Sequence, residues 1–368
     1  DEDGLTRLEE FGYGTSDKST DSDFDTLPDG WEVDNGRDPS VADYMVSAGS
    51  VHTCALDDTG VVCWGLNDDG QTDVPALSNP TQVSVGLATT CALDDTEVAC
   101  WGTNEYGLTI VPALFNPAQI SVGDRHACAL DDTGVVCWGL NDDGQTDVPA
   151  LSNPTQVSAG NNSTCALDDS GNGVTCWGNN GDGQGNVPDT LSNPTQVSVG
   201  GYHTCALDDN GVSCWGRNTF GQTDVPPLSN PSQVSAGSFH TCALDDTGVV
   251  CWGNSDFGRM EVPNLTSPTQ ISTGDSHACT LGDNGVTCWG RNSEGESTVP
   301  DLLIDPDGDG YSTQGGADAF PLDATEWLDT DSDGIGNNAD ADDDNDGVPD
   351  ASDAFPLDVS ESVDTDSD

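Results

Sequence analysis

The chain has 368 residues, of which 66 are acidic and 7 are basic, so its formal net charge at neutral pH is −59. A surface with this charge repels nucleic acid and anionic lipid, which argues against a nucleic-acid-binding or membrane-surface role. The same charge attracts divalent cations and suits a salty medium. The length is sufficient for one large closed domain with smaller appendages.

The 14 cysteines occur only as local pairs, a pattern typical of extracellular proteins with oxidised thiols. No apolar run approaches the ~20 residues of a transmembrane helix, and no signal peptide is visible. The chain begins and ends inside acidic motifs. We therefore expect a trimmed piece of a longer secreted or cell-surface protein, with no membrane span in this part.

The N-terminal segment, residues 1–45, contains a motif typical of a twelve-residue calcium loop. Oxygen ligands at loop positions 1, 3, 5, 7, 9 and 12 can surround one Ca²⁺, position 7 contributing its backbone carbonyl. The residues at these positions are Asp21, Asp23, Asp25, Leu27, Asp29 and Glu32. Position 6, usually Gly, is Thr26. An acidic linker is the alternative, but the register of the carboxylates favours calcium.

Residues 46–303 contain seven copies of a repeat of about 37 residues, which start near residues 46, 83, 120, 157, 197, 234 and 271. A fixed period of this length, rich in short β-type runs, is typical of a propeller or a solenoid. In the first copy, we predict strands at His52–Leu56 and Val61–Trp64, joined by the turn Asp57-Asp-Thr-Gly60. The residues around 72–75 and 82–84 are predicted to supply further strands.

A hairpin of this kind brings the two cysteines of one copy within disulfide reach. The predicted pairs are Cys54 with Cys63, Cys91 with Cys100, Cys128 with Cys137, Cys165 with Cys176, Cys205 with Cys214, Cys242 with Cys251, and Cys279 with Cys288. Zinc binding is the alternative, but each pair lacks further ligands. Side-chain alternation places each cysteine pair on one face of the hairpin and the Trp that follows the second cysteine on the other. We infer that each Trp packs on the disulfide face of the neighbouring blade.

The pattern V-S-A-G-x-x-H-T-C-A-L-D-D-T-G-V-V-C-W-G-x-N-x-x-G-Q resembles the repeat of the regulator of chromosome condensation family. The resemblance implies an all-β fold, a seven-bladed β-propeller with one blade per repeat. It also implies a recognition scaffold, because other proteins of this fold act as binding discs, including secreted inhibitors of β-lactamases. The nuclear exchange-factor role of the founding member does not suit the acidity and the paired cysteines.

All five histidines occupy the same repeat position, two residues before the first cysteine: His52, His126, His203, His240 and His277. A ring of imidazoles could bind a metal or titrate. Thr89 and Ser163 occupy this position in the second and fourth copies. We therefore favour a structural hydrogen bond inside each blade.

Catalysis needs an asymmetric group of residues, but residues Ala55–Ser84 and Ala129–Ser158 are identical in sequence. We therefore expect that the protein is not an enzyme and has no catalytic residues. The second copy is distinctive, and Tyr106 and Phe115 are predicted to form an exposed contact patch.

The C-terminal segment, residues 304–368, contains two complete acidic loops and a third, incomplete one. The first places ligands at Asp329, Asp331, Asp333, Ile335 (by its carbonyl), Asn337 and Asp340. The second places them at Asp342, Asp344, Asp346, Val348 (by its carbonyl), Asp350 and Asp353. The incomplete loop has Asp305, Asp307 and Asp309, followed by Thr313 and Gly316 where ligands are expected. Asp318 is a candidate replacement.

These loops, together with the recurrent Ala-Phe-Pro-Leu-Asp at Ala319–Asp323 and Ala354–Asp358, resemble thrombospondin type 3 repeats and related surface stalks. That resemblance implies that Ca²⁺ replaces a hydrophobic core.

The sequence as a whole predicts a non-enzymatic, calcium-stabilised structural or adhesion module of a cell-surface protein or extracellular filament. We expect its partners to be other extracellular proteins, glycans or copies of itself. The alternative is a soluble secreted binding or inhibitor propeller with a single target.

Overall fold

The computed structural model describes residues 44–94, 97–168 and 173–360, together with Leu27, Asp29 and residues 32–33. The chain divides into two compact units. The first contains the repeats and extends to Pro300, and the second comprises Asp283–Gly285 and the residues from Asp301 onward. No helix among the described residues has the length and apolar character needed to span a membrane.

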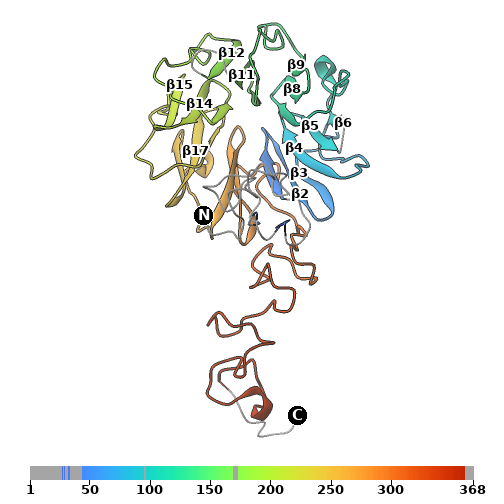
Figure 1. The fold of residues 1–368 in the computed structure, drawn as a ribbon, viewed down its shortest axis with the longest axis vertical. Helices are drawn as coiled ribbons and strands as arrows, with labels where there is room; N and C mark the ends of the chain where they lie inside the picture. Colours follow the sequence, from blue (N-terminus) through green and yellow to red (C-terminus); the bar gives the residue numbers. More distant parts are fainter. Residues whose placement is uncertain are drawn as a thin grey trace. The chain divides into compact units, whose positions relative to one another are not determined.

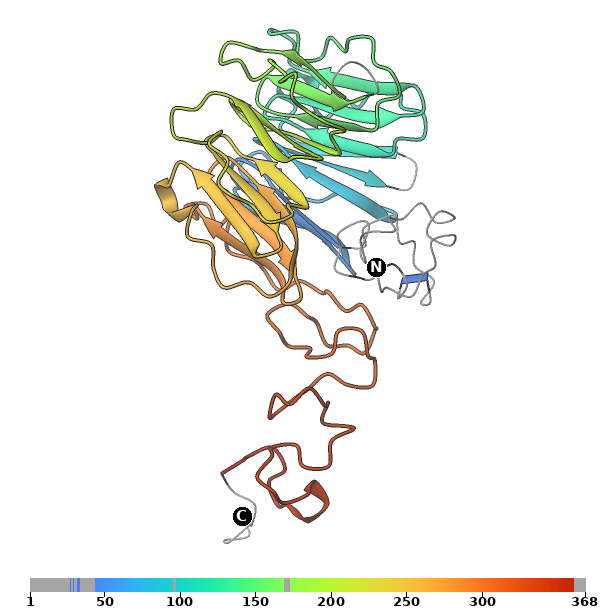
Figure 2. The same cartoon turned by 60° about the vertical axis from the view of Figure 1, so that its left-hand side comes forward.

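The described part of the first unit contains seven three-stranded antiparallel sheets, arranged as the blades of a propeller (Figures 1 and 2). Each sheet consists of three consecutive strands, so no blade borrows a strand from another repeat. The strands of blades 1 to 4 are β1 (Met45–Ala48), β2 (His52–Asp57), β3 (Gly60–Gly65), β4 (Pro80–Val85), β5 (Thr89–Asp94), β6 (Glu97–Gly102), β7 (Gln119–Val122), β8 (His126–Asp131), β9 (Gly134–Gly139), β10 (Gln156–Ala159), β11 (Ser163–Leu167) and β12 (Val174–Gly178). Those of blades 5 to 7 are β13 (Gln196–Val199), β14 (His203–Asp208), β15 (Gly211–Gly216), β16 (Gln233–Ala236), β17 (His240–Asp245), β18 (Gly248–Gly253), β19 (Pro268–Thr273), β20 (His277–Gly282) and β21 (Gly285–Gly290).

The second and third strands of each blade form the predicted hairpin. In blade 1, Cys54 lies opposite Cys63 and Leu56 opposite Val61, which confirms the predicted register. The same cross-strand position holds a cysteine pair in blades 2 to 6.

The seven predicted disulfides are all present. They join Cys54 to Cys63, Cys91 to Cys100, Cys128 to Cys137, Cys165 to Cys176, Cys205 to Cys214, Cys242 to Cys251, and Cys279 to Cys288. The first cysteine of each pair, on the middle strand, is completely buried. The second cysteine, on the outer strand, is only partly buried in each pair: Cys63, Cys100, Cys137, Cys176, Cys214, Cys251 and Cys288. Each bridge therefore ties the less protected outer strand to the buried middle strand.

The prediction of a strand at Thr72–Pro75 is wrong, whereas the one around residue 83 lies within β4. The backbone amide of Asp73 donates to the carbonyl of Gly70, and that of Val74 donates to Thr72. Pro75 has no amide hydrogen. Local turns therefore use the donors that a fourth strand would need.

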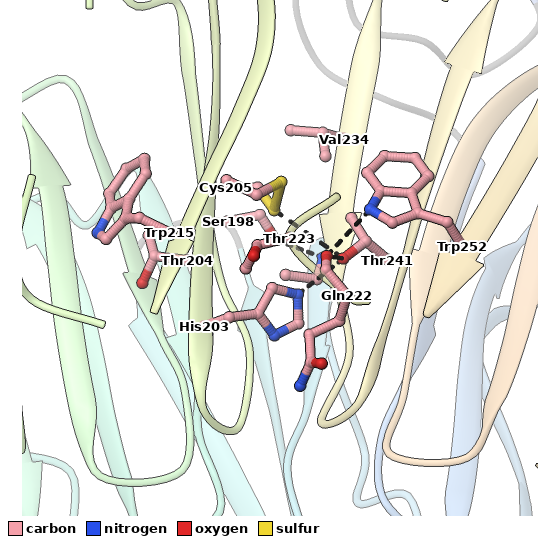
Figure 3. Close-up of a disulfide and its surroundings, with 12 residues drawn as sticks. Ser198, His203, Thr204, Cys205, Trp215, Gln222, Thr223, Val234, Thr241 and Trp252 are labelled. Atoms are coloured by element: carbon pink, nitrogen blue, oxygen red, sulfur yellow. Dashed lines mark hydrogen bonds between the residues drawn. A yellow bond between two sulfur atoms is a disulfide. The ribbon is translucent and has the colours of Figure 1, made fainter. Parts of the chain in front are cut away.

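The blades are joined by a repeated contact of each Trp with the preceding blade, as Figure 3 shows for Trp252. Trp252 packs with Cys205 and Leu207, and its indole nitrogen donates to the backbone carbonyl of Gln222 at 3.0 Å. The predicted packing on the disulfide face of the neighbouring blade is confirmed here and for Trp138 and Trp289. The indole bond recurs in all seven blades, to the carbonyls of Glu296, Gln71, Leu108, Gln145, Gln184, Gln222 and Arg259. Because the acceptor is a main-chain atom, the side chain at this position can vary.

Blades 7 and 1 close the ring through the same contacts without sharing a strand. The amide of Val46 donates to the side-chain carbonyl of Gln270 at 2.6 Å, and that of Ala48 donates to the hydroxyl of Ser272 at 2.9 Å. Trp64 donates to the carbonyl of Glu296 at 3.1 Å. The contact between blades 7 and 1 therefore uses the same types of hydrogen bond as the contacts between consecutive blades.

Seven glycines form the innermost layer of the ring, each against the backbone of the glycine in the next blade: Gly49, Gly86, Gly123, Gly160, Gly200, Gly237 and Gly274. A Cβ atom added at Gly274 would lie 1.9 Å from the carbonyl oxygen of Gly49, and the corresponding distance from Gly123 to Gly160 is 2.1 Å. The blades approach so closely at the centre that only glycine fits.

The described residues of the second unit form turns, with one short 3-10 helix, η3 (Asp350–Ser352). Tyr311 and Trp327 stack with ring centroids 4.9 Å apart. Many backbone amides of this unit donate to aspartate side chains, and these aspartates form the first candidate site.

Candidate functional site

The second unit brings carboxylates together in three groups, each containing the first three acidic ligands of one predicted loop. The groups are Asp305 with Asp307 and Asp309, Asp329 with Asp331 and Asp333, and Asp342 with Asp344 and Asp346. Within each group, one oxygen of every carboxylate lies within 4.8 Å of the others. The structure therefore forms the three clusters that the spacing predicts.

Each cluster is shaped by the same hydrogen bonds between carboxylates and backbone amides. In the Asp329 loop, Asp329 Oδ2 accepts from the amide of Gly334 and Asp331 Oδ1 from that of Asp333, both at 3.0 Å. Asp333 Oδ1 accepts from the amide of Ile335 at 2.8 Å. The other two loops have the equivalent bonds. Asp305 accepts two amides, one on each oxygen, and Asp331 also accepts from the Asn345 side chain. In the other aspartates of the clusters, one carboxylate oxygen is used to curve the loop.

Several of the second oxygens of these aspartates are buried and have no hydrogen-bond partner among the described residues. They are Asp307 Oδ2, Asp309 Oδ2, Asp329 Oδ1, Asp342 Oδ1 and Asp344 Oδ2, together with Oδ2 of Asp318 and Asp353. A buried carboxylate oxygen without a donor is costly unless a cation or a proton satisfies it. A donor set made only of oxygens fits a hard cation.

The electrostatics of the clusters agree with this geometry. Burial, followed by the charges of Asp309, Asp318 and Asp305, raises the pKa of Asp307 to about 6. Burial and neighbouring carboxylates also raise the pKa values of Asp331 and Asp344. Burial, followed by the charges of Asp309 and Asp305, raises the pKa of Asp318 as well, which places Asp318 beside the incomplete cluster.

The remaining predicted ligands have varied positions. At loop position 9, Asn337 Oδ1 accepts a hydrogen bond from the backbone amide of Thr330, and Asp350 Oδ1 accepts one from that of Asp343. Each bond joins position 9 of the loop to position 2. Asp340 Oδ1 accepts from the amides of Ala341 and Asp342. The charge of Asp353 acts on Asp344. Ile335 and Val348 donate their amides to the fifth-position carboxylates.

The predicted N-terminal calcium loop lies largely outside the described residues. Asp21, Asp23 and Asp25 are not among those described, whereas Leu27, Asp29 and Glu32 are buried. This site stays a prediction.

The histidines are structural, but the expectation of a bond inside the blade is wrong. His203 Nε2 lies 2.7 Å from the hydroxyl of Thr241 in the next blade (Figure 3). Thr241 donates its hydroxyl hydrogen to the carbonyl of Gln222, so His203 is the donor at Nε2. His52, His126 and His277 contact Thr90, Thr164 and Thr53 in the same way.

Burial disfavours the charged form of these imidazoles. It lowers the pKa of His126, His203 and His277 to about 4, and that of His52 to about 3. His240 faces Ala278 instead of a threonine, and neither ring nitrogen has a partner among the described residues. The imidazoles are therefore neutral at physiological pH and do not form a pH-sensitive ring.

A cavity of about 70 Å³ lies at the centre of the propeller, lined by the seven glycines, the residues that precede them and most of those that follow them. Asp124 and Asp275 approach it from blades 3 and 7. The hydroxyl of Ser50 donates to Asp124 at 3.3 Å, and that of Ser238 donates to Asp275. Burial, with the charge of Asp275, raises the pKa of Asp124 to about 7.

The raised pKa of Asp124 predicts a pH-dependent stability. The native state retains a proton between about pH 4 and 7 that the unfolded chain releases, so the free energy of unfolding falls with rising pH by up to ~1.4 kcal/mol per pH unit. Asp124→Asn should remove this slope, as measured by urea unfolding from pH 4 to 8. The exposed hairpin variant Asp132→Asn is the control. Equal slopes in wild type and Asp124→Asn would contradict the prediction.

The predicted Tyr106 and Phe115 patch does not form. Tyr106 lies in η1 (Glu105–Gly107), which follows β6. Phe115 lies at the opposite end of the blades, where its amide donates to Asp131 in the hairpin of β8 and β9. Sequence reasoning also missed a cluster of Tyr202, Arg217, Phe220 and Phe239, in which Tyr202 and Phe239 stack at 5.1 Å.

Six segments of the chain match the model of the "Regulator of chromosome condensation (RCC1) repeat": residues 46–71, 118–145, 155–184, 195–222, 232–259 and 269–296. They cover six of the seven copies and leave out the second. The chain therefore carries RCC1 repeats, as the sequence pattern predicted. No curated protein matches the chain in sequence.

Solved structures share the fold. The entire ectodomain of the receptor kinase CR4 from Physcomitrella patens is 26% identical, with a TM-score of 0.58 over 67% of this chain and 72% of that one. The CRINKLY WD40 ectodomain of the Arabidopsis thaliana receptor kinase ACR4 is 24% identical, with a TM-score of 0.55 over 68% and 97%. Human WBSCR16 is 20% identical, with a TM-score of 0.56 over 65% and 87%. The disulfides and the likeness to the CR4 ectodomain point to an extracellular location.

Proposed function

We propose that this protein is a non-enzymatic extracellular binding module, in which a disulfide-linked propeller presents the binding surface and Ca²⁺ orders the C-terminal unit. The observation that carries the proposal is one disulfide in every blade of an RCC1-repeat propeller. Disulfides persist in oxidising compartments. The similar CR4 structure is a receptor ectodomain, which supports an extracellular binding role for this chain.

The three aspartate clusters support calcium as the cation. Asp305, Asp307, Asp309 and Asp318 would hold one ion, and the clusters that begin at Asp329 and Asp342 would hold two more. Bound Ca²⁺ would supply positive charge to the buried oxygens. The chain itself contributes loops that amide–carboxylate bonds have already curved.

The near-identity of the blades supports a role without catalysis, because Ala55–Ser84 and Ala129–Ser158 are identical in sequence. Two cavities lie among the described residues of the propeller. The central cavity is lined by glycines, small side chains and two aspartates. A second cavity, of about 420 Å³, lies beside the hairpin of β14 and β15. Its polar side chains are those of Asp208, Asp209, Asn210 and Asn230.

Calcium removal should loosen the second unit and leave the propeller intact. In chelator, proteolysis should move into residues 301–360, while the disulfide-linked blades resist cleavage. Asp344→Asn should weaken Ca²⁺ binding at least ~10-fold in calorimetry, because it removes one charged ligand. Asp323→Asn, whose carboxylate bonds only to Thr325 nearby, is the matched control. Identical cleavage with and without calcium would rule out the calcium proposal.

Within this function, we favour a structural or adhesive role in a cell-surface protein or an extracellular filament, and the alternative is a soluble inhibitor of one target. Sedimentation and negative-stain imaging of the full chain, in millimolar calcium and then in chelator, separate the two. Calcium-dependent chains of molecules support the filament. Single particles in both buffers support the soluble binder.

A further inference from the structure

The two faces of the propeller differ in composition. We call the end with the turns between second and third strands the hairpin face, and the opposite end the loop face. The described hairpins contain acidic pairs such as Asp131–Asp132 and Asp245–Asp246 and no lysine or arginine. The four arginines described in the propeller, Arg125, Arg217, Arg259 and Arg291, all belong to the loop face. Main-chain bonds place them there: Arg125 accepts from Leu140, and Arg217 and Arg291 donate to Tyr202 and Ser276.

The loop face of blades 5 and 6 carries an aromatic cluster, which we define as Tyr202, Arg217, Phe220 and Phe239. Tyr202 and Phe239 stack at 5.1 Å, and Phe220 meets Phe239 edge-on at 5.5 Å. The Arg217 guanidinium lies 5.1 Å from the Tyr202 ring centroid and 5.9 Å from that of Phe239. Among the described residues it forms no salt bridge, although the chain is rich in carboxylates. The rings hold Arg217 in place, together with a hydrogen bond that Arg217 Nε donates to the Thr219 hydroxyl at 3.1 Å.

This cluster is accessible to a partner. Phe220 is 46% exposed, and Phe257, in the equivalent loop of blade 6, is 62% exposed. The two loops differ in one hydrogen bond. In blade 5, the side-chain carbonyl of Gln222 accepts from the backbone amide of Phe220 at 2.9 Å, whereas the equivalent residue of blade 6 is Arg259, which has no side-chain acceptor. Without that acceptor, Phe257 adopts φ 63° within η2 (Asp256–Gly258). Exposed aromatic side chains beside an arginine are typical of the energetic centre of a protein interface.

Exposed carboxylates lie on the same face, in the loops of blades 4 to 7: Asp182, Asp224, Asp256, Glu261 and Glu294. Complementary charge on a partner would therefore be positive. A second copy of this chain is a poor source of such charge, because it has 7 basic residues among 368. Nucleic acid is repelled by the same carboxylates.

We propose that the aromatic cluster on the loop face is the docking site for a protein segment with an apolar centre flanked by lysine or arginine. The apolar side chain packs on Phe220 and Phe239, and the flanking cations lie opposite the carboxylates of the loop face. This proposal rests on the proposed function as a binding module and names the surface and the chemistry of the partner. It does not depend on calcium or on filament formation.

The probe is a displayed library of random twelve-residue peptides, selected against the intact protein with calcium present throughout. Selected peptides should contain an aromatic or large aliphatic residue with lysine or arginine on both sides. Their affinity should fall at least ~10-fold in Phe220→Ala, which removes an exposed ring and leaves the charge unchanged. Phe115→Ala removes an exposed ring from the hairpin face and should have no effect. The association rate should fall as salt rises.

Three results would overturn the proposal: no enrichment, enrichment of acidic or uncharged peptides, or equal affinity for wild type and Phe220→Ala. A further arm tests glycans by calorimetry with neutral hexasaccharides of glucose and N-acetylglucosamine. Binding of these sugars that is lost in Phe220→Ala would assign the cluster to carbohydrate instead. Because calcium is present in every arm, failure here is distinct from failure of the calcium test on residues 301–360.

Discussion

Gly274→Ala is expected to lower the free energy of unfolding of the propeller by about 3 kcal/mol. The new Cβ would lie 1.9 Å from the carbonyl oxygen of Gly49 and 2.8 Å from a carbon of the His277 ring. Neither neighbour is a flexible side-chain end, so blades 7 and 1 must separate. Overpacking a rigid site typically costs ~1–3 kcal/mol, and this overlap is with backbone. Guanidinium unfolding under non-reducing conditions measures the change.

Gly181→Ala is the matched control for this substitution. Gly181 lies in an exposed loop, and its nearest neighbour to an added Cβ is the Asn179 side chain, at 3.4 Å. The free energy of unfolding of the Gly181→Ala variant should stay within ~0.5 kcal/mol of that of wild type. If Gly274→Ala is as stable as Gly181→Ala, the central glycines are not required by steric contact.

Trp64→Ala is expected to lower the free energy of unfolding of the propeller by about 4 kcal/mol or more. Trp64 is 8% exposed, and its indole hydrogen bonds to the Glu296 carbonyl, where blade 7 meets blade 1. Removing a buried Trp costs ~3–5 kcal/mol, and the lost hydrogen bond adds ~1 kcal/mol. Hydrogen exchange should rise in β1, because the contact between blades 7 and 1 has no connecting chain to hold it.

Trp64→Phe separates the two contributions. It keeps most of the buried aromatic area and removes only the indole donor, and Glu296 still accepts from Thr53 at 2.9 Å. Its cost should therefore be well below that of the alanine variant. Equal losses in both variants would show that the hydrogen bond, and not the packing, stabilises this junction.

The sequence predicted the hairpin contacts within one repeat, although the strand predicted at Thr72–Pro75 does not form. The disulfides and the Leu56–Val61 register follow from the two-residue alternation of a hairpin and the Asp-Asp-Thr-Gly turn. The histidine partner was mispredicted because Thr241 belongs to the repeat after that of His203. The sequence did not predict how the ring closes for the same reason, because closure depends on the contact in space between repeats 7 and 1.

The candidate sites divide in the same way. The three aspartate clusters were predictable because each occupies five consecutive residues. The aromatic cluster was not, because Tyr202, Phe220 and Phe239 come from two repeats and three segments. A signal was nevertheless present. Phe220 replaces the acidic residue found at Asp69, Asp143 and Asp182, and Phe239 occupies the position of Val51, Ala88, Asn162 and Ser276 in other copies.

In every blade, a main-chain carbonyl accepts the hydrogen bond from the Trp indole of the next blade. The side chain of the residue that supplies this carbonyl therefore does not contribute to that contact between blades. The seven copies illustrate the result: Gln71, Leu108, Arg259 and Glu296 all occupy this position with the same backbone bond. The neighbouring loop residues vary among acidic, aromatic and amide side chains. Diversification of the outer loops is thus uncoupled from assembly, and such a ring can evolve new specificities while its architecture stays fixed.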